Sequence, residues 1–502
     1  LEQWRPAILF FNSFMVLGTI FVVDMPTALQ HEVINSRDIT TVGGGTNNTN
    51  TENACKVCLG LGAVRYNLLH SSLRWTSAIL SLPVGYLIDR LGNGRSAILL
   101  TSLQFLGSIL FAVSAVSHAP IVTAMYAVMV AGRILLAFGE TPLCFVQGRV
   151  VAHWFSEESL LPLSFIILSQ RGGSILTFYV SATVADKVGF GVAVWSGACL
   201  CGLGVISAIC LAMALRKIQM KQASKTSDTN RTTFSDIKAV PRKFWVHVCM
   251  IALLYGQVIS FHANLPEYLL LQYGFSPTTS SYITGSAMLP FVVGPLVAMA
   301  LNKIDCIGIL VTCAAVTIVP VFSLLGFCHS VHPLFLTISL GFANCVTELG
   351  MWQVAVLLVP RSCFGTVTGI MYLVRNVVIG LTLLLDGYLL QKHDIHGIRD
   401  PLEGYHDFFL ALVMLTSLSV LCGILLNVWD INDTCAINQR LGRWKHKTDE
   451  KSSLLQKAIE MDMTEKSPVG DGSMKTGSGV ADYPNGHEGN ETNKSINGEA
   501  TS

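Results

Sequence analysis

The residues of this chain most able to do chemistry lie between positions 132 and 171, where charges interrupt two long apolar segments. A short polar patch, residues 148–159, separates the segments and is expected to be a turn between antiparallel helices. Glu140 lies about nine residues before the turn and Arg171 about twelve after it, so at about 1.5 Å per residue they share a depth. Together they could hold a solute with an ammonium at one end and a carboxylate at the other. The alternative is a structural ion pair between the two side chains.

The cost of these charges favours a functional role. Arg133, Glu140 and Arg171 all fall inside segments long enough to cross a bilayer. A charge at the centre of a spanning helix costs about 2.5–3.5 kcal/mol on insertion scales and usually marks a substrate or ion pathway. The segment therefore predicts a solute pathway within a membrane protein.

Composition sets the fold class. Of 502 residues, 51% are hydrophobic and only 13% are charged, whereas roughly a quarter of the residues in a soluble domain are charged. Apolar runs of about 20 residues recur along the chain, which predicts an all-α membrane protein with twelve spanning helices. The sequence contains no nucleophile, metal-site or phosphate-loop pattern, so we expect neither an enzyme nor a cofactor.

The distribution of charge predicts the domain organisation. Residues 1–215 and 244–428 each hold six apolar spans, and the basic stretch 216–243 between them is expected to be a cytosolic linker. Excess Lys and Arg mark the cytosolic side of a membrane. Residues 429–502 are too polar to bury a core and are expected to form a disordered cytosolic tail. Both termini are therefore expected in the cytosol.

A short pattern of glycine, acidic and basic residues follows the second span. Gly85 allows close helix packing, and Asp89 and Arg90 precede a glycine-containing basic turn that ends at Arg95. The pattern resembles the loop between helices two and three of the major facilitator superfamily. That resemblance implies two six-helix bundles and a gating role for Gly85, Asp89 and Arg90.

Further stretches resemble one family within this superfamily, the lysosomal dipeptide transporters of animals. The resemblance covers most of residues 6–428 and is stronger in the first half. It rests on residues 21–29, 66–69, 85–91, 132–140, 154–155, 168–174 and 273–276, with Gly369 and Asn376.

The resemblance implies a lysosomal uniporter that exports dipeptides, preferring cationic side chains, by alternating access. It implies that Glu140 faces the ammonium of the dipeptide and Arg171 its carboxylate, with Tyr66, Arg133 and Trp352 as further substrate-binding candidates. It also implies a partner, a single-span glycosylated lysosomal membrane protein that shields the transporter from proteases.

The chain departs from this family at Arg74, Glu348 and Arg375, where relatives carry uncharged residues. These three are also substrate-binding candidates, and they leave the side-chain specificity open. Glu348 is expected either to receive a cationic side chain or to pair with Arg375 on the next span. Asp386 lies near a helix end and is expected to be solvated.

Two other functions remain open on sequence grounds. Four arginines could instead serve an organic anion: Arg74, Arg133, Arg171 and Arg375. A membrane scaffold or nutrient sensor that binds without transporting is the second alternative, although such a protein gains nothing from the cost of buried charge. Uptake assays with charged and neutral dipeptides separate these functions, and proton coupling is left open.

The tail contains a sorting pattern. Glu450 is followed after three residues by Leu454 and Leu455, which is the arrangement of an acidic dileucine signal. Clathrin adaptors read such signals on cytosolic tails, so we expect them as partners that direct the protein to lysosomes.

The loop of residues 31–62 provides a test of topology. It holds the glycosylation sequon at Asn47, together with Cys55 and Cys58, which could form a disulfide with each other or with Cys328. The other sequons, at Asn230, Asn432, Asn490 and Asn493, fall in segments expected to be cytosolic. N-glycans and disulfides belong to the lumenal or extracellular face.

Asn47→Gln is therefore expected to abolish the whole glycan-dependent mobility shift on a gel, because no other sequon reaches the lumen. Asn230→Gln is the matched control and is expected to leave the shift unchanged. A glycan that survives Asn47→Gln would reverse the proposed orientation.

Overall fold

The computed structural model describes residues 4–35, 59–116, 122–155, 160–221, 240–359, 364–392, 401–433 and 435–439. The contacts divide the chain into two units, residues 1–444 and 445–502, and every described residue belongs to the first. Asn47, Glu450, Leu454 and Leu455 lie outside the described residues, so the glycosylation and sorting predictions stay predictions. Helices and short connections account for the described part of the chain, where no strand occurs.

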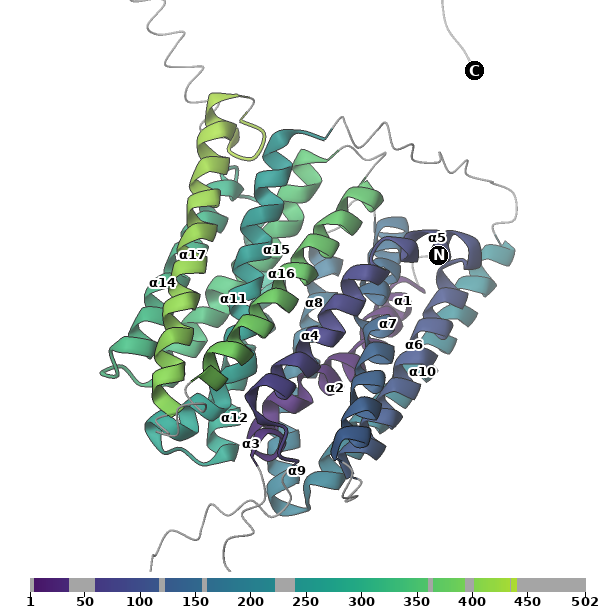
Figure 1. Ribbon diagram of the computed structural model, residues 1–502. Helices are drawn as coiled ribbons and strands as arrows, with labels where there is room; N and C mark the ends of the chain where they lie inside the picture. Colours follow the sequence, from purple (N-terminus) through teal and green to yellow (C-terminus); the bar gives the residue numbers. More distant parts are fainter. Residues whose placement is uncertain are drawn as a thin grey trace, which may run out of the picture. The chain divides into compact units, whose positions relative to one another are not determined.

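The first half of the chain forms a series of packed helices (Figure 1). One short turn of π-helix, η3, interrupts the fifth predicted span. The elements are α1 (Arg5–Phe14), α2 (Leu17–Ala28), α3 (Gln30–Ile34), α4 (Gly62–Leu80), α5 (Pro83–Leu91), α6 (Asn93–Val116), α7 (Val122–Trp154), α8 (Leu160–Leu176), η3 (Thr177–Ser181), α9 (Ala182–Lys187) and α10 (Phe190–Lys221).

The second half repeats the pattern with fewer, longer helices. A 3₁₀ turn, η5, interrupts its second span. The elements are α11 (Arg242–Tyr273), α12 (Pro277–Ser286), η5 (Leu289–Val293), α13 (Gly294–Leu301), α14 (Ile307–Phe327), α15 (Pro333–Leu358), α16 (Phe364–Lys392) and α17 (Pro401–Asn432).

Among the described residues, 10 helical segments are long and apolar enough to cross a membrane. Two of the predicted spans, α4–α5 and α8–α9, fall short of that standard. Helix α4 carries Arg65 and Arg74, and α8 ends after 17 residues at the π-helical turn. Both nevertheless pack against spanning neighbours, α4 on α7 and α16, and α8 on α2 and α13. The all-α prediction is confirmed, and the two spans that fall short are those that carry Arg74 and Arg171.

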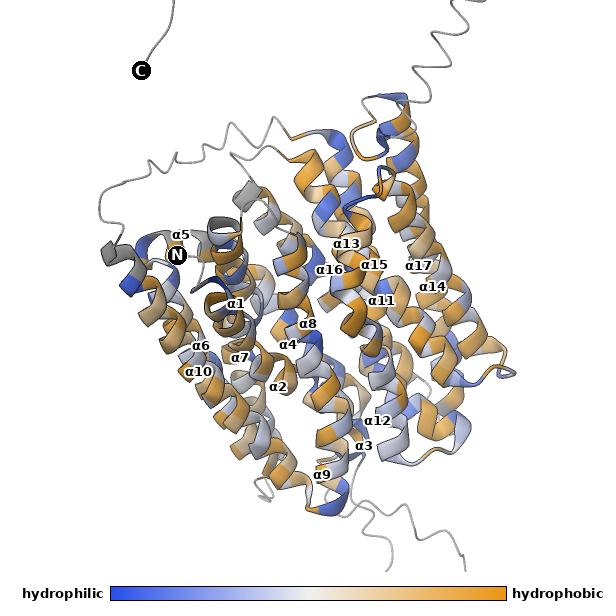
Figure 2. Ribbon diagram, turned by 180° about the vertical axis from the view of Figure 1, so that it is seen from behind, coloured by the Kyte–Doolittle hydropathy of each residue, from blue (hydrophilic) through white to orange (hydrophobic). Residues whose placement is uncertain are grey.

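The outer surface of the helices suits contact with lipid. Large apolar side chains are exposed on several spans, including Ile206 at 57%, Phe335 at 68% and Leu421 at 61%. Figure 2 shows hydrophobic residues along the helices and hydrophilic residues gathered toward their ends. In water such a surface would be unfavourable, but hydrocarbon offers it a matching solvent.

The connection between α5 and α6 depends on one glycine. Helix α5 ends at Leu91 and α6 begins at Asn93, leaving Gly92 between them with a φ of 77°. Residues with a side chain rarely adopt this left-handed conformation, whereas glycine does so without steric cost. The predicted gating residues Gly85, Asp89 and Arg90 therefore lie on α5, just before this turn.

The end of α17 differs from the prediction that a tail begins at residue 429. The helix runs on to Asn432, and Asp430 is fully buried. Its carboxylate accepts hydrogen bonds from the backbone N–H groups of Ala436, Ile437 and Asn438 and pairs with Lys243 at 3.2 Å. A buried, bonded carboxylate gives this segment a fixed partner on α11, so the packed region extends about ten residues beyond the predicted boundary.

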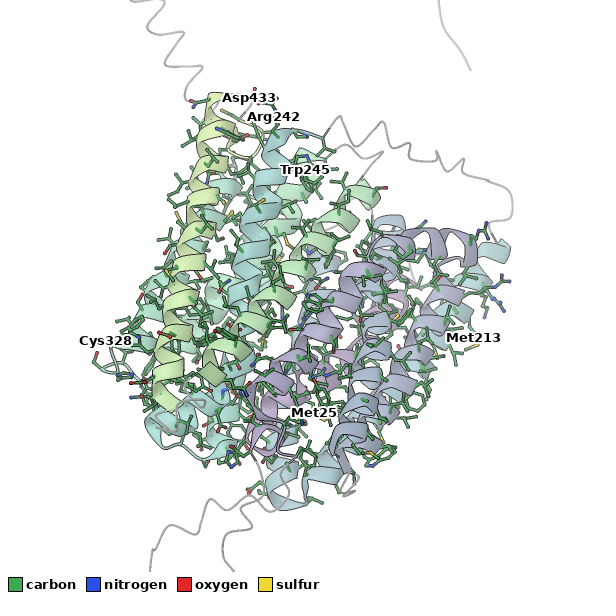
Figure 3. The ribbon with its side chains drawn as sticks, in the orientation of Figure 1. Met25, Met213, Arg242, Trp245, Cys328 and Asp433 are labelled. Carbon is green, nitrogen blue, oxygen red and sulfur yellow. The ribbon has the colours of Figure 1, made fainter. Side chains whose placement is uncertain are left out.

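Figure 3 shows Arg242 and Asp433 at the end of the molecule where α11 begins and α17 ends. Cys328 lies at the opposite end, where it is exposed and makes no disulfide with another described cysteine. Cys55 and Cys58 lie outside the described residues.

Helices α6 and α7 cross at two glycines. A Cβ atom on Gly132 would lie 2.9 Å from the carbonyl oxygen of Gly107, and one on Gly107 would lie 2.7 Å from the carbonyl oxygen of Gly132. Backbone cannot yield to relieve such contacts as a flexible side chain would. Small residues of this kind allow membrane helices to approach closely, and here the approach fixes the helix that carries Glu140.

Gly132→Ala is expected to lower stability by about 1–3 kcal/mol through overpacking of this crossing. Gly148→Ala is the matched control, because it lies on the same helix with no atom within 4 Å of the added Cβ. That control is expected to be neutral or stabilising, since alanine favours helix over glycine by about 0.8–1.0 kcal/mol. Thermal unfolding of both purified variants checks this, and equal melting temperatures would contradict it.

Candidate functional site

The first predicted site residue, Glu140, forms a buried ion pair within the first half. Arg74 of α4 donates through Nη1 to Oε1 of Glu140 on α7, and the two side chains are only 10% and 11% exposed. Ser77, one turn after Arg74, donates to the other carboxylate oxygen at 3.4 Å. Arg74 was predicted as a substrate-binding candidate, and the structure makes it the counter-charge of Glu140.

The second predicted site residue, Arg171, forms a buried ion pair between the halves. Its Nη2 lies 2.5 Å from Oε2 of Glu348 on α15, and the side chains are 15% and 9% exposed. The guanidinium also lies over the ring of Phe291 in η5, 4.8 Å from its centroid. Three elements therefore converge on Arg171, two of them from the second half.

Two sequence-based alternatives are wrong in this structure. Glu140 and Arg171 do not pair with each other, and Glu348 pairs with Arg171 and not with Arg375. The physical reason is helix geometry. Gln170 bonds Cys144 and Gln147 of α7, at 3.4 and 3.1 Å, and the next residue on a helix points about 100° away. Arg171 is thereby turned from α7 toward the second half, although its depth matches that of Glu140.

Arg375 lies at the same level on α16 and is held by aromatic rings. Its guanidinium carbon lies 4.3 Å from the ring centroid of Tyr372 and 5.0 Å from that of Tyr255. The following residue, Asn376, donates to Thr141 at 3.3 Å, and Thr141 directly follows Glu140. Trp352, another predicted site residue, packs beside Tyr372 with ring centroids 5.8 Å apart.

Arg133 and Asp24 are two further charged residues of the first half. Arg133 is fully buried; its Nη1 donates to the carbonyl of Val23 at 2.9 Å, and its guanidinium lies over Phe111. Asp24 accepts a hydrogen bond of 2.5 Å from Ser174 on α8. The structure thus joins α2 to α7 and α8 at the predicted depth. A carboxylate within the first span was the sequence signal for Asp24.

The charged residues described above form the charged cluster: Asp24, Arg74, Arg133, Glu140, Arg171, Glu348 and Arg375. Tyr66 lies outside this cluster, in a contact between the halves. Its hydroxyl donates to the carbonyl of Ala263 on α11 at 2.5 Å, and the neighbouring Asn67 exchanges hydrogen bonds with Asn264 at 3.1 and 3.2 Å. Tyr66 and Asn67 lie near the start of α4, the helix that packs against α3. In this conformation Tyr66 therefore joins the two halves near this end of α4.

The same end carries a titratable contact. Nδ1 of His31, on α3 beyond the first spanning segment, lies 3.5 Å from Oε2 of Glu267 on α11, and Asn35 donates to Glu267 at 3.2 Å. The hydrogen bond with Glu267 raises the pKa of His31 above its usual range, against the opposing effect of burial, and the charge of Glu32 adds to the increase. His31 is therefore charged in a mildly acidic compartment, and its attraction to Glu267 is lost as the pH rises through the raised pKa.

Asp386 is a correction to the sequence analysis. It was expected to be solvated near a helix end, yet it is 2% exposed and accepts a hydrogen bond from Ser260 of α11. The hydroxyl replaces a water as the donor to the buried carboxylate.

A cavity of about 460 Å³ lies elsewhere, where α5 and α6 face α10. Arg95, Trp154 and Arg216 are among the residues that line it, and none of the predicted substrate-binding residues does. The charged cluster is therefore identified as the candidate site from its residue types and ion pairs, because its residues do not line this cavity.

The fold and the charged cluster define a class of membrane transport protein. The family model of the Major Facilitator Superfamily matches residues 7–383, and the chain belongs to this superfamily. The lysosomal dipeptide transporter MFSD1 of Bos taurus is 22% identical to this chain over 442 residues, covering 84% of this chain and 86% of its own length. The proteins of the same name from Homo sapiens and Danio rerio are also 22% identical and cover 84% and 85% of this chain. These matches confirm the resemblance drawn from the sequence.

Arg74→Gln is expected to destabilise the protein by about 3–5 kcal/mol, because it leaves the Glu140 carboxylate buried without a counter-charge. The double variant Arg74→Gln with Glu140→Gln is expected to be more stable than the sum of the single changes indicates. Arg65→Gln is the control, since Arg65 lies on the same helix but is exposed. Thermal unfolding of Arg74→Gln, Glu140→Gln, the double variant and the Arg65→Gln control tests the pair. Strictly additive effects would show that the two charges do not interact.

Proposed function

We propose that this protein is a dipeptide transporter of the lysosomal membrane that exports its substrate to the cytosol by alternating access. The observation that carries the proposal is the presence of two buried ion pairs, Arg74–Glu140 within the first half and Arg171–Glu348 between the halves. A dipeptide is a zwitterion, so its ammonium and carboxylate can replace one partner in each pair. The MFSD1 relatives, which are named as lysosomal dipeptide transporters, support this assignment.

The exchange of partners follows from charge. The ammonium of the dipeptide approaches Glu140 and takes over the place of Arg74, while the carboxylate approaches Arg171 and takes over the place of Glu348. Two hydrogen bonds in parallel between a guanidinium and a carboxylate orient the substrate. Neither replacement adds net charge to the buried site, so the desolvation cost of binding stays limited.

The second exchange links binding to movement of the halves. Arg171 and Glu348 belong to different halves, so a substrate that replaces Glu348 removes an attraction between them. At the end formed by Tyr66, Asn67 and Glu267 the halves are held by further hydrogen bonds. Opening that end requires these bonds to break, and we propose that it faces the lumen.

The finer expectations from the sequence analysis remain part of the proposal. Transport is uniport, with gating by Gly85, Asp89 and Arg90 on α5. The lumenal glycan is on Asn47, and the single-span glycosylated membrane protein is the accessory partner. Clathrin adaptors recognise Glu450, Leu454 and Leu455 in the tail.

The preference for cationic side chains is the part of the resemblance that the geometry supports least. Such a side chain needs an available carboxylate, and both Glu140 and Glu348 already face an arginine. One observation instead favours the alternative of an organic anion: the site holds more arginines than carboxylates. No observation of this kind favours the other alternative, a membrane scaffold or nutrient sensor that binds without transporting.

Glu140→Gln and Arg171→Lys are expected to weaken dipeptide binding about ten-fold or more, because a charge-assisted hydrogen bond contributes roughly 1.5–3 kcal/mol. Arg171→Lys keeps the charge but loses the planar fork of donors. An N-acetylated dipeptide is expected to lose mainly the Glu140 contact, and a C-amidated one mainly the Arg171 contact. The measurement is thermal stabilisation of purified protein over a series of ligand concentrations.

Lys303→Gln serves as the control, since it removes an exposed cation distant from the cluster. Variants that unfold at lower temperature but still bind the dipeptide with wild-type affinity would show that the two residues are purely structural, and would end the proposal. Flux measured with and without a proton gradient decides between uniport and proton coupling.

A further inference from the structure

We propose that Arg375 binds the side-chain carboxylate of an acidic dipeptide, so that this transporter prefers dipeptides containing Asp or Glu. The inference rests on the proposed function and names its substrate class. It reverses the side-chain preference that the resemblance implies, and four features of the site support it.

The first feature is the charge of the cluster. Arg74, Arg133, Arg171 and Arg375 lie within electrostatic range of the carboxyl groups of Asp24, Glu140 and Glu348. Four cations against three carboxyl groups leave at least one positive charge uncompensated. The two termini of a dipeptide cancel each other, so only the side chain can supply the missing negative charge. A cationic side chain would add a second unpaired charge to a poorly solvated site.

The second feature is that Arg375 is available. Glu140 occupies Arg74 and Glu348 occupies Arg171, whereas no described carboxylate lies within ion-pair distance of Arg375. The Nε of Arg375 is buried without a hydrogen-bond partner, although the side chain as a whole is only partly buried. A buried donor of this kind costs free energy until a ligand satisfies it.

The third feature sets Arg375 apart from Arg133, which also has no carboxylate partner among the described residues. Arg133 is 0% exposed, and a backbone carbonyl accepts from its Nη1. It therefore serves the packing of α2 on α7. Arg375 is the arginine that combines an uncompensated charge with access for a ligand.

The fourth feature is the fixed orientation of the Arg375 guanidinium. The buried rings of Tyr255 and Tyr372 lie against it, with Tyr372 in contact with Phe145 and Trp352 in turn. Aromatic contacts attract a cation without neutralising it. They leave its N–H groups without a carboxylate partner, and a carboxylate ligand can accept two parallel bonds from a guanidinium.

The position of Arg375 suits a side chain of a peptide held at Glu140 and Arg171. Asn376 contacts Thr141, so the residue after Arg375 meets the residue after Glu140. The three charged groups come from three different helices, α7, α8 and α16. The substrate termini and its side chain would each meet a separate helix.

The test compares dipeptides of matched size with the full-length purified protein. Ala-Glu and Ala-Gln differ almost only in charge, Ala-Lys reverses the charge, and glutarate is an organic dianion without a peptide bond. Thermal stabilisation at about pH 7, where the Glu side chain is ionised, yields an apparent dissociation constant for each. Ala-Glu is expected to bind about ten-fold or more tightly than Ala-Gln, and Ala-Lys most weakly.

Three variants locate the effect. In Arg375→Gln the ratio between Ala-Glu and Ala-Gln is expected to fall to about one, and Arg375→Lys is expected to give an intermediate ratio because it keeps the charge without the fork. Lys303→Gln removes an exposed cation outside the cluster and is expected to keep the wild-type ratio. If Arg375→Gln does not fold, the four ligands on the wild-type protein still decide the preference.

The outcomes are distinguishable. Equal binding of Ala-Glu and Ala-Gln, or tighter binding of Ala-Lys, by the wild-type protein would overturn the acidic preference and leave dipeptide transport standing. A wild-type ratio that persists in Arg375→Gln would remove Arg375 from the site. Stabilisation by glutarate and by none of the dipeptides would overturn the proposed function itself, and with it this inference.

Discussion

The constraint on which this structure depends is the stabilisation of arginines inside the spanning helices. Arg74, Arg171 and Arg375 each come from a different helix, and each is stabilised in a different way. Arg74 has a carboxylate in its own half, Arg171 has one in the opposite half, and Arg375 has two aromatic rings. A buried charge without any partner would be strongly destabilising. The packing of α4, α7, α8, α15 and α16 is therefore inseparable from the electrostatics of the cluster.

This dependence makes the site responsive to a ligand. An ion pair whose only role is to hold helices together is expected to be closed off from solvent. The paired side chains here keep some exposure, up to 15% for Arg171. The ion pair between Arg171 and Glu348 is separate from the hydrogen bonds of Tyr66 and Asn67, which also join the two halves. Under the proposed function, substrate acts on the first contact and opening breaks the second.

The sequence was sufficient for the fold class, and it singled out Arg74, Glu348 and Arg375, which the structure places in ion-pair or aromatic contacts. Hydropathy and the rise per residue determine depth, and these are local properties. Partners could not be predicted, because the direction of Arg171 depends on Gln170 facing α7. Tyr255 and Tyr372 gave no signal, since aromatic residues are common in apolar spans. The packed end of α17 was missed because its polar residues resemble a tail until Asp430 is seen to bond the following backbone.

The ion pair between the halves also has a consequence for biogenesis. Arg171 and Glu348 are 177 residues apart in the chain. At about 5–20 residues per second, synthesis delivers the carboxylate on the order of ten seconds or more after the arginine. During that interval α8 carries an arginine without its final partner, and the ion pair can form only after α15 has been made. The first half is for this reason an incomplete product on its own, and the two halves mature as one assembly.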